Sequence, residues 1–142
     1  MNKIVNLDKC FDLFEDTFSP KIIGELNGQY VMLVHLEGDK VPWHIHDNED
    51  EMFYVLEGVL EIFEGEQTHI VKSGEFYIVN RGIEHRVVPQ GHVKLMLFEP
   101  AETKHTGSVE SEITKKKFDS NQNEIISKLL VQTHKSALAI RR

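Results

Sequence analysis

Three histidines and one glutamate in this chain are spaced in a way that suits metal binding. His44 and His46 lie two residues apart, so in an extended segment both imidazoles point to the same face. Glu51 follows the polar stretch 47–50, which can turn the chain and bring the carboxylate back beside them. His85 begins a later strand-like segment. Together these side chains form a mixed nitrogen and oxygen set that suits divalent Fe, Mn, Ni, Co, Cu or Zn.

This ligand set is more specific than any of its parts, because single histidines have many other roles and an H-x-H pair is weak evidence by itself. The other five histidines are expected to be structural or exposed: His35, His69, His92, His105 and His134. The predicted ligands of one metal ion are His44, His46, Glu51 and His85. Four protein ligands in an octahedral shell would leave two positions for water or substrate. The pattern assigns no catalytic residue and no organic cofactor.

The middle of the chain contains a series of short β-type segments that must position these ligands. The segments are rich in Val, Ile, Phe and Tyr and are separated by turn residues, with no helical pattern between them. The predicted strands are residues 30–36, 51–57, 59–64, 67–73, 75–79, 85–89 and 92–99. This arrangement predicts an antiparallel sandwich or barrel rather than alternating strands and helices.

Two glycines are predicted to form tight turns in this mainly β region. Gly58 would join the strands 51–57 and 59–64, because glycine adopts strained turn conformations without a steric penalty. Gly65 would form the tip of the next hairpin. The apolar residues expected to carry the barrel core include Val31, Leu33, Val55, Ile62 and Ile78.

Helical patterns are confined to the two ends of the chain. Apolar residues at roughly helical spacing predict a short helix over 7–16, ended by Pro20, which disfavours helical backbone in the residue before it. A second amphipathic helix is predicted over 121–137. We therefore expect one domain, with a barrel and N-terminal arm over 1–117 and a helical extension over 118–142.

The stretch around the first three candidate ligands resembles the first motif of the cupin family. Every fixed position of that motif is filled at the family's spacing, by Gly38, His44, His46, Glu51 and Gly58. The second motif is matched at Gly74, Gly82 and His85 and departs at Asn80, where proline is usual, and Pro89, where asparagine is usual. Neither departure falls on a metal ligand, so both affect loop geometry more than chemistry.

The resemblance covers about residues 25–100 and implies a double-stranded β-helix, or jelly-roll, barrel that holds one divalent metal. The known members of the cupin family suggest that this chain is a metal-dependent enzyme that acts on a small organic molecule. The expected types are a dioxygenase, a sugar isomerase or epimerase, or a lyase. The alternative is a non-catalytic cupin that uses its metal to bind or store a small ligand. Residues expected near the barrel mouth are Trp43, Phe53, Tyr77 and Arg86.

Composition excludes several classes of partner. A net charge of −7 argues against nucleic acid and against an anionic membrane surface, both of which select for clustered basic residues. Cys10 is the single cysteine, so no internal disulfide can form, and a cytoplasmic location is expected. The sequence has no apolar stretch of signal-peptide or membrane-spanning type.

A homodimer is expected, because the open sheet edge and the apolar stripe of 121–137 both need cover.

Overall fold

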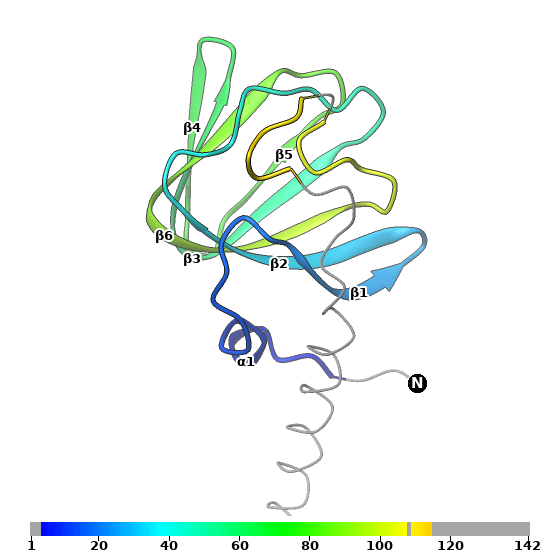
Figure 1. Cartoon of the computed structure of the whole chain (residues 1–142), viewed down its shortest axis with the longest axis vertical. Coiled ribbons are helices and arrows are strands. Elements are labelled where there is room, and N and C mark those ends of the chain that lie inside the picture. Colours follow the sequence, from blue (N-terminus) through cyan, green and yellow to red (C-terminus); the bar gives the residue numbers. More distant parts are fainter. Residues whose placement is uncertain (1–3, 108, 115–142) are drawn as a thin grey trace, which may run out of the picture.

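The computed structural model describes residues 4–107 and 109–114 and forms a curled antiparallel β-sheet with one short helix (Figure 1). Its elements in chain order are α1 (Leu7–Phe11), β1 (Lys21–Leu26), β2 (Gln29–Glu37), β3 (Glu51–Glu64), β4 (Gln67–Lys72), β5 (Phe76–Val79) and β6 (His85–Pro100). The predicted mainly β jelly-roll barrel is confirmed. The predicted helix over 121–137 and the extension over 118–142 lie outside the described residues.

Two long strands, β3 and β6, hold the barrel together by pairing with each other along most of their length. The strand order is β1-β2-β6-β3-β4, and β5 pairs with the first part of β3. β5 and β4 pair with successive parts of β3, and the sheet curls around an apolar interior (Figure 1). The interior includes Val34, Val55, Leu60, Ile62, Val71, Val87, Val93 and Leu95.

Gly58 is a bend within one strand and not the turn that the sequence predicted. The pairing of β3 with β6 is irregular between Val55 and Val59, on both sides of Glu57. Gly58 has a φ of +96°, and a Cβ there would lie 2.6 Å from the carbonyl oxygen of His92. A bulge that brings two backbones this close requires glycine. The predicted strands 85–89 and 92–99 are likewise one strand, β6, whereas the hairpin tip at Gly65 is confirmed.

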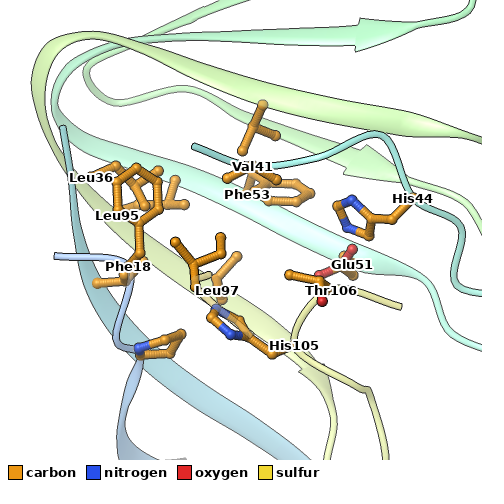
Figure 2. A pocket seen from close by; sticks show the side chains of 14 residues that line it. Phe18, Leu36, Val41, His44, Glu51, Phe53, Leu95, Leu97, His105 and Thr106 are labelled. Carbon is orange, nitrogen blue, oxygen red and sulfur yellow. The ribbon is translucent and has the colours of Figure 1, made fainter. Parts of the chain in front are cut away.

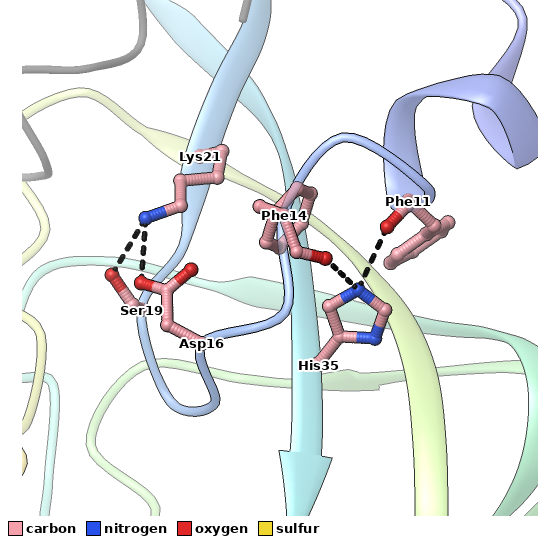
Figure 3. Close-up of polar contacts among 6 residues, drawn as sticks. All are labelled: Phe11, Phe14, Asp16, Ser19, Lys21 and His35. Atoms are coloured by element: carbon pink, nitrogen blue, oxygen red, sulfur yellow. Dashed lines mark hydrogen bonds and ion pairs between the residues drawn. The ribbon is translucent and has the colours of Figure 1, made fainter.

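The N-terminal helix is shorter than predicted and ends at Phe11. The side chain of Asn6 accepts a hydrogen bond from the Lys9 amide and caps its start. At its other end, the carbonyls of Phe11 and Phe14 both face the ring of His35 on β2 (Figure 3). These carbonyls accept from a side chain instead of continuing the helix. The arm packs its apolar side chains on the outer face of the sheet, around Leu33.

The predicted core was partly wrong about which face each residue takes. Val55 and Ile62 are in the barrel interior, whereas Leu33 is buried on the outer face under the N-terminal arm, with Val31 packed beside it. Ile78 is 43% exposed, because its neighbour Val79 takes the inward position on β5. Strand β1 was not predicted from the sequence. Among the described residues no helix is long and apolar enough to cross a membrane.

Candidate metal centre

The four predicted ligands come from three parts of the chain and meet inside one end of the barrel. His44 and His46 lie on the segment between β2 and β3, Glu51 is the first residue of β3, and His85 is the first residue of β6. The amide of each of His44 and His85 donates to the other's carbonyl at 3.0 Å, which fixes the loop against the strand. All four side chains are buried, with no more than 6% exposed.

The ligand atoms converge at metal-binding range. One nitrogen from each histidine and one oxygen of Glu51 all lie within 4.8 Å of one another. Nδ1 of His44 lies 2.8 Å from the Pro42 carbonyl, and Nδ1 of His85 lies 2.9 Å from the Ile83 carbonyl. A carbonyl only accepts, so Nδ1 carries the proton in both rings. This tautomer leaves each Nε2 lone pair free to bind a cation.

Three of the converging atoms have no hydrogen-bond partner in the protein. They are Nε2 of His46, Nε2 of His85 and Oε1 of Glu51. The two nitrogens lie 2.8 Å and 3.2 Å from that oxygen, but their geometry is not that of a hydrogen bond. Leaving buried polar atoms without a partner costs free energy, and a shared cation would remove that cost. The arrangement therefore fits a metal ion held by three imidazoles and one carboxylate.

The pKa shifts at the centre show which groups favour a cation nearby. Burial lowers the pKa of His44 to about 4, so its ring is neutral near pH 7. Burial also disfavours a charged His85, but the adjacent Glu51 raises its pKa above the usual value. Burial alone would raise the pKa of Glu51, and the neighbouring rings of His46 and His85 instead hold it well below normal. The carboxylate is thus ionised and ready to bind a cation.

A second buried carboxyl, Glu99, lies beside Glu51 and was missed by the sequence analysis. It is 3% exposed and continues the inward-facing series of Val93, Leu95 and Leu97 along β6. Burial first, and the charge of Glu51 second, raise the pKa of Glu99 well above its usual value. The sequence does contain a signal for it, because Glu99 continues the two-residue spacing of this apolar series and every second residue of a strand shares a face.

The residues expected at the barrel mouth are separated in the structure. Phe53 is buried, and its ring centroid lies 6.3 Å from that of His85. Tyr77 donates to Glu64, Arg86 pairs with Asp39, and Trp43 is 38% exposed. Only Phe53 of these four lines the cavity next to the metal centre. None of the other described histidines joins the ligand cluster, as expected.

A segment after β6 closes this end of the barrel; we call residues 101–107 and 109–114 the strap. Thr103 and Thr106 of the strap are buried, and Thr106 donates to the carbonyl of Val109. Gly107 has a φ of +57°, and a Cβ there would collide with the carbonyl of Ile45 and lie 3.4 Å from the His44 ring. The strap therefore packs directly on the ligand-bearing loop, and this contact requires glycine.

Comparison with known proteins agrees with this geometry. The family model described as "Cupin domain" matches residues 31–100. A Bacillus subtilis relative, the uncharacterized protein YdbB, is 32% identical over 87 residues, covering 61% of this chain and 76% of its own. The chain belongs to the cupin family.

Solved structures show the same relationship. A cupin-2 domain containing protein from Shewanella frigidimarina superimposes with a TM-score of 0.66 at 36% identity, covering 68% of this chain and 94% of that one. Protein NMB1881 from Neisseria meningitidis gives a TM-score of 0.63 at 25% identity, with 70% and 100% covered. Both likenesses extend over nearly the whole of the other chain, so this cupin carries residues beyond the shared barrel.

The side chain of Asp50 connects the two cupin motifs next to Asn80. The carboxylate of Asp50 accepts from the Arg81 amide at 2.8 Å and lies 3.5 Å from the Asn80 side-chain nitrogen. Asp50 directly precedes the ligand Glu51. These contacts connect the loop before His85 to the start of β3.

Proposed function

We propose that this cupin is a metal-dependent enzyme that acts on a small organic molecule, with one divalent transition metal on His44, His46, Glu51 and His85. The observation that carries the proposal is the convergence of three buried donor atoms that lack any protein partner. A cavity adjoins them, lined in part by His44 and Glu51 (Figure 2). A closed structural site would not need such a space, whereas a catalytic site does.

The residues of the site have separable roles in this proposal. The Pro42 and Ile83 carbonyls orient the His44 and His85 rings, and Glu51 supplies the negative charge. The strap and the ring of Phe53 exclude bulk water from the ligands, which strengthens electrostatic interactions inside. A bound metal would supply Lewis-acid polarisation or oxygen activation. Turnover assays distinguish the dioxygenase, isomerase, epimerase and lyase types of reaction.

The first test is the metal content of protein purified without added metal, followed by turnover assays on keto acids, catechols and sugar phosphates. We expect close to one equivalent of a transition metal in the parent protein. The Glu51→Gln variant should lose it, because the anionic ligand is gone. Glu57→Gln is the matched control, since Glu57 is also on β3 but its side chain is 63% exposed and pairs with Lys94.

Turnover separates the enzyme from the alternative, a metal-assisted binding or storage cupin. A metal-loaded sample that converts a candidate molecule, with conversion lost in Glu51→Gln, supports the enzyme. A sample that binds such molecules without converting any of them supports the binding cupin. A parent protein that takes up no metal at pH 7.5 would contradict both.

Two further features of the proposal concern assembly and compartment. Phe76 and Ile78 on β5 are 59% and 43% exposed, so this apolar surface would gain from cover in a homodimer. Light scattering should then give twice the chain mass of 16.4 kDa, and a mass of one chain would contradict the dimer.

Cys10 is buried, with a pKa raised by burial to about 11, and needs no disulfide partner. That supports a reducing compartment such as the cytoplasm.

A further inference from the structure

The cavity beside the metal centre is small and lies inside the barrel, between β2, β3, β6 and the strap (Figure 2). Its volume is about 50 Å³. At roughly 10–15 Å³ for each water-sized atom, that is room for about three to five non-hydrogen atoms. His44 and Glu51 lie at one end of the cavity, and Phe18 and Leu36 lie at the other (Figure 2).

The lining of the cavity is mainly apolar. It comprises Phe18, Pro20, Val34, Leu36, Val41, Phe53, Val87, Leu95, Leu97 and Ile113, with four polar residues, His44, Glu51, His105 and Thr106. Two of these four are predicted metal ligands. The hydroxyl of Thr106 is already engaged with the Val109 carbonyl and the Thr114 hydroxyl.

The charge of the lining restricts what can bind there. Among the described residues that line the cavity there is no lysine or arginine to accompany a phosphate or a second carboxylate. Burying such a dianion without a counter-charge would cost several kcal/mol. A divalent metal with the Glu51 carboxylate retains one positive charge, and one anionic donor from the ligand would neutralise it. The site therefore favours one polar end on the ligand and disfavours two.

We propose that the ligand of this centre is a short aliphatic molecule whose single polar end binds the metal and whose apolar end fills the cavity. This inference rests on the proposed metal function and narrows its substrate class. The same reasoning disfavours sugar phosphates and dicarboxylates as ligands. The predicted length is about three to four carbon atoms beyond the donor group, from the room in the cavity.

The proposal is tested with Co²⁺-loaded protein and the unbranched alkanoates from acetate to heptanoate. Coordination of the carboxylate is followed by the visible spectrum of Co²⁺. Each methylene that enters the cavity should tighten binding about fourfold, since its burial is worth about 0.8 kcal/mol. The gain should stop near butanoate or pentanoate and reverse for longer acids. Succinate and glycerol 3-phosphate should bind at least tenfold more weakly than butanoate.

A cavity-filling variant shows where the chain binds. Val41 lines the cavity but is only partly buried, so Val41→Phe should leave the fold intact. It should weaken butanoate about tenfold and leave acetate within twofold. Ile70→Phe is the control, because Ile70 is 47% exposed on β4 and does not line the cavity. Circular dichroism and thermal unfolding verify that both variants fold.

The outcomes distinguish this inference from the function on which it rests. If one equivalent of Co²⁺ binds and Glu51→Gln abolishes that binding, the metal centre stands whatever the alkanoates do. Affinity that is independent of chain length, or glycerol 3-phosphate binding as tightly as butanoate, would then overturn the aliphatic ligand alone. A chain-length gain that persists unchanged in Val41→Phe would also overturn it, because the apolar end would lie elsewhere.

Discussion

Two groups of histidines in this protein, one around the metal centre and one around the buried His35, show how the same residue type serves chemistry in one place and architecture in another. In the metal centre, Nε2 of His46 and of His85 are buried without a hydrogen-bond partner. On the outer side of the sheet, His35 uses both ring nitrogens. Its Nε2 contacts the Phe11 and Phe14 carbonyls at 3.0 Å (Figure 3). Its Nδ1 lies 2.9 Å from Nε2 of His92.

His35 is as buried as the rings of the metal centre, so the difference between them lies in the lone pairs. Because carbonyls only accept, Nε2 of His35 carries the proton, and in the neutral ring Nδ1 accepts from His92. His35 therefore has no lone pair left for a cation. In the metal centre, carbonyls accept from Nδ1–H of His44 and of His85 and leave each Nε2 lone pair free. A histidine pair is thus a candidate metal site when its nitrogens are left without partners, and a structural link when all are satisfied.

The largest effect that tests this comparison is the loss of a predicted ligand. His46→Ala should lower metal affinity by at least about 100-fold, as expected for removal of one of four ligands, while the apolar barrel keeps the fold. His92→Ala should leave metal affinity unchanged, because His92 belongs to the structural pair. Metal affinity is measured by competition with a chelator, and the fold by circular dichroism. An unfolded His46→Ala protein would show instead that the metal is structural.

The next largest effect is on stability and concerns the other histidine group. His35→Leu should destabilise the protein by about 2–3 kcal/mol, because the buried Phe11 and Phe14 carbonyls would lose their donor. Metal affinity should stay within twofold of the parent. Urea denaturation measures the first quantity and chelator competition the second. A stable His35→Leu protein with weakened metal binding would contradict the division of roles.

Within the metal centre itself, the rings should differ in how they respond to pH. The pKa of His44 is lowered to about 4 by burial, so this ring is already neutral between pH 5 and 8 and adds no pH dependence there. Burial opposes charge on His85 too, but Glu51 raises its pKa, so His85 holds a proton that metal must displace as pH falls. Metal affinity should therefore decrease towards pH 5.

The measurement for this prediction is the NMR titration of the imidazole protons in metal-free protein, together with metal affinity at pH 8 and 5. The chemical shift of His44 should stay constant down to about pH 5. The chemical shift of His85 should change at a pH above the ordinary histidine pKa. Equal affinity at both pH values would contradict a centre dominated by imidazoles. A His44 ring that gains its proton before His85 as the pH is lowered would contradict the predicted order of the two pKa values.

The sequence predicted the convergence of the four candidate ligands better than it predicted the strands that carry them. The spacing of His44, His46 and Glu51 is local, so an extended segment and a turn suffice to bring the ligands together. Gly58 was misread because positive φ suits a bulge as well as a turn, and only the partner strand decides between them. Ile78 was misplaced because β5 has apolar residues on both faces, so alternation gave no direction.

The smallest expected effect concerns Glu99, the second buried acid of the metal centre. Its pKa is raised by burial and by Glu51, from the usual 4.5, so folding keeps a proton on a group that the unfolded chain releases. That lowers the free energy of unfolding as the pH rises above 4.5 and has no effect below it.

Glu99→Gln removes this cost and keeps a hydrogen-bond donor beside Glu51. The metal-free variant should be more stable than the parent by roughly 1 kcal/mol at pH 8 and equal to it near pH 4.5. Urea denaturation at the two pH values measures the difference, with Glu57→Gln as the exposed control. An equal gain at both pH values would show that packing, and not the retained proton, sets the effect.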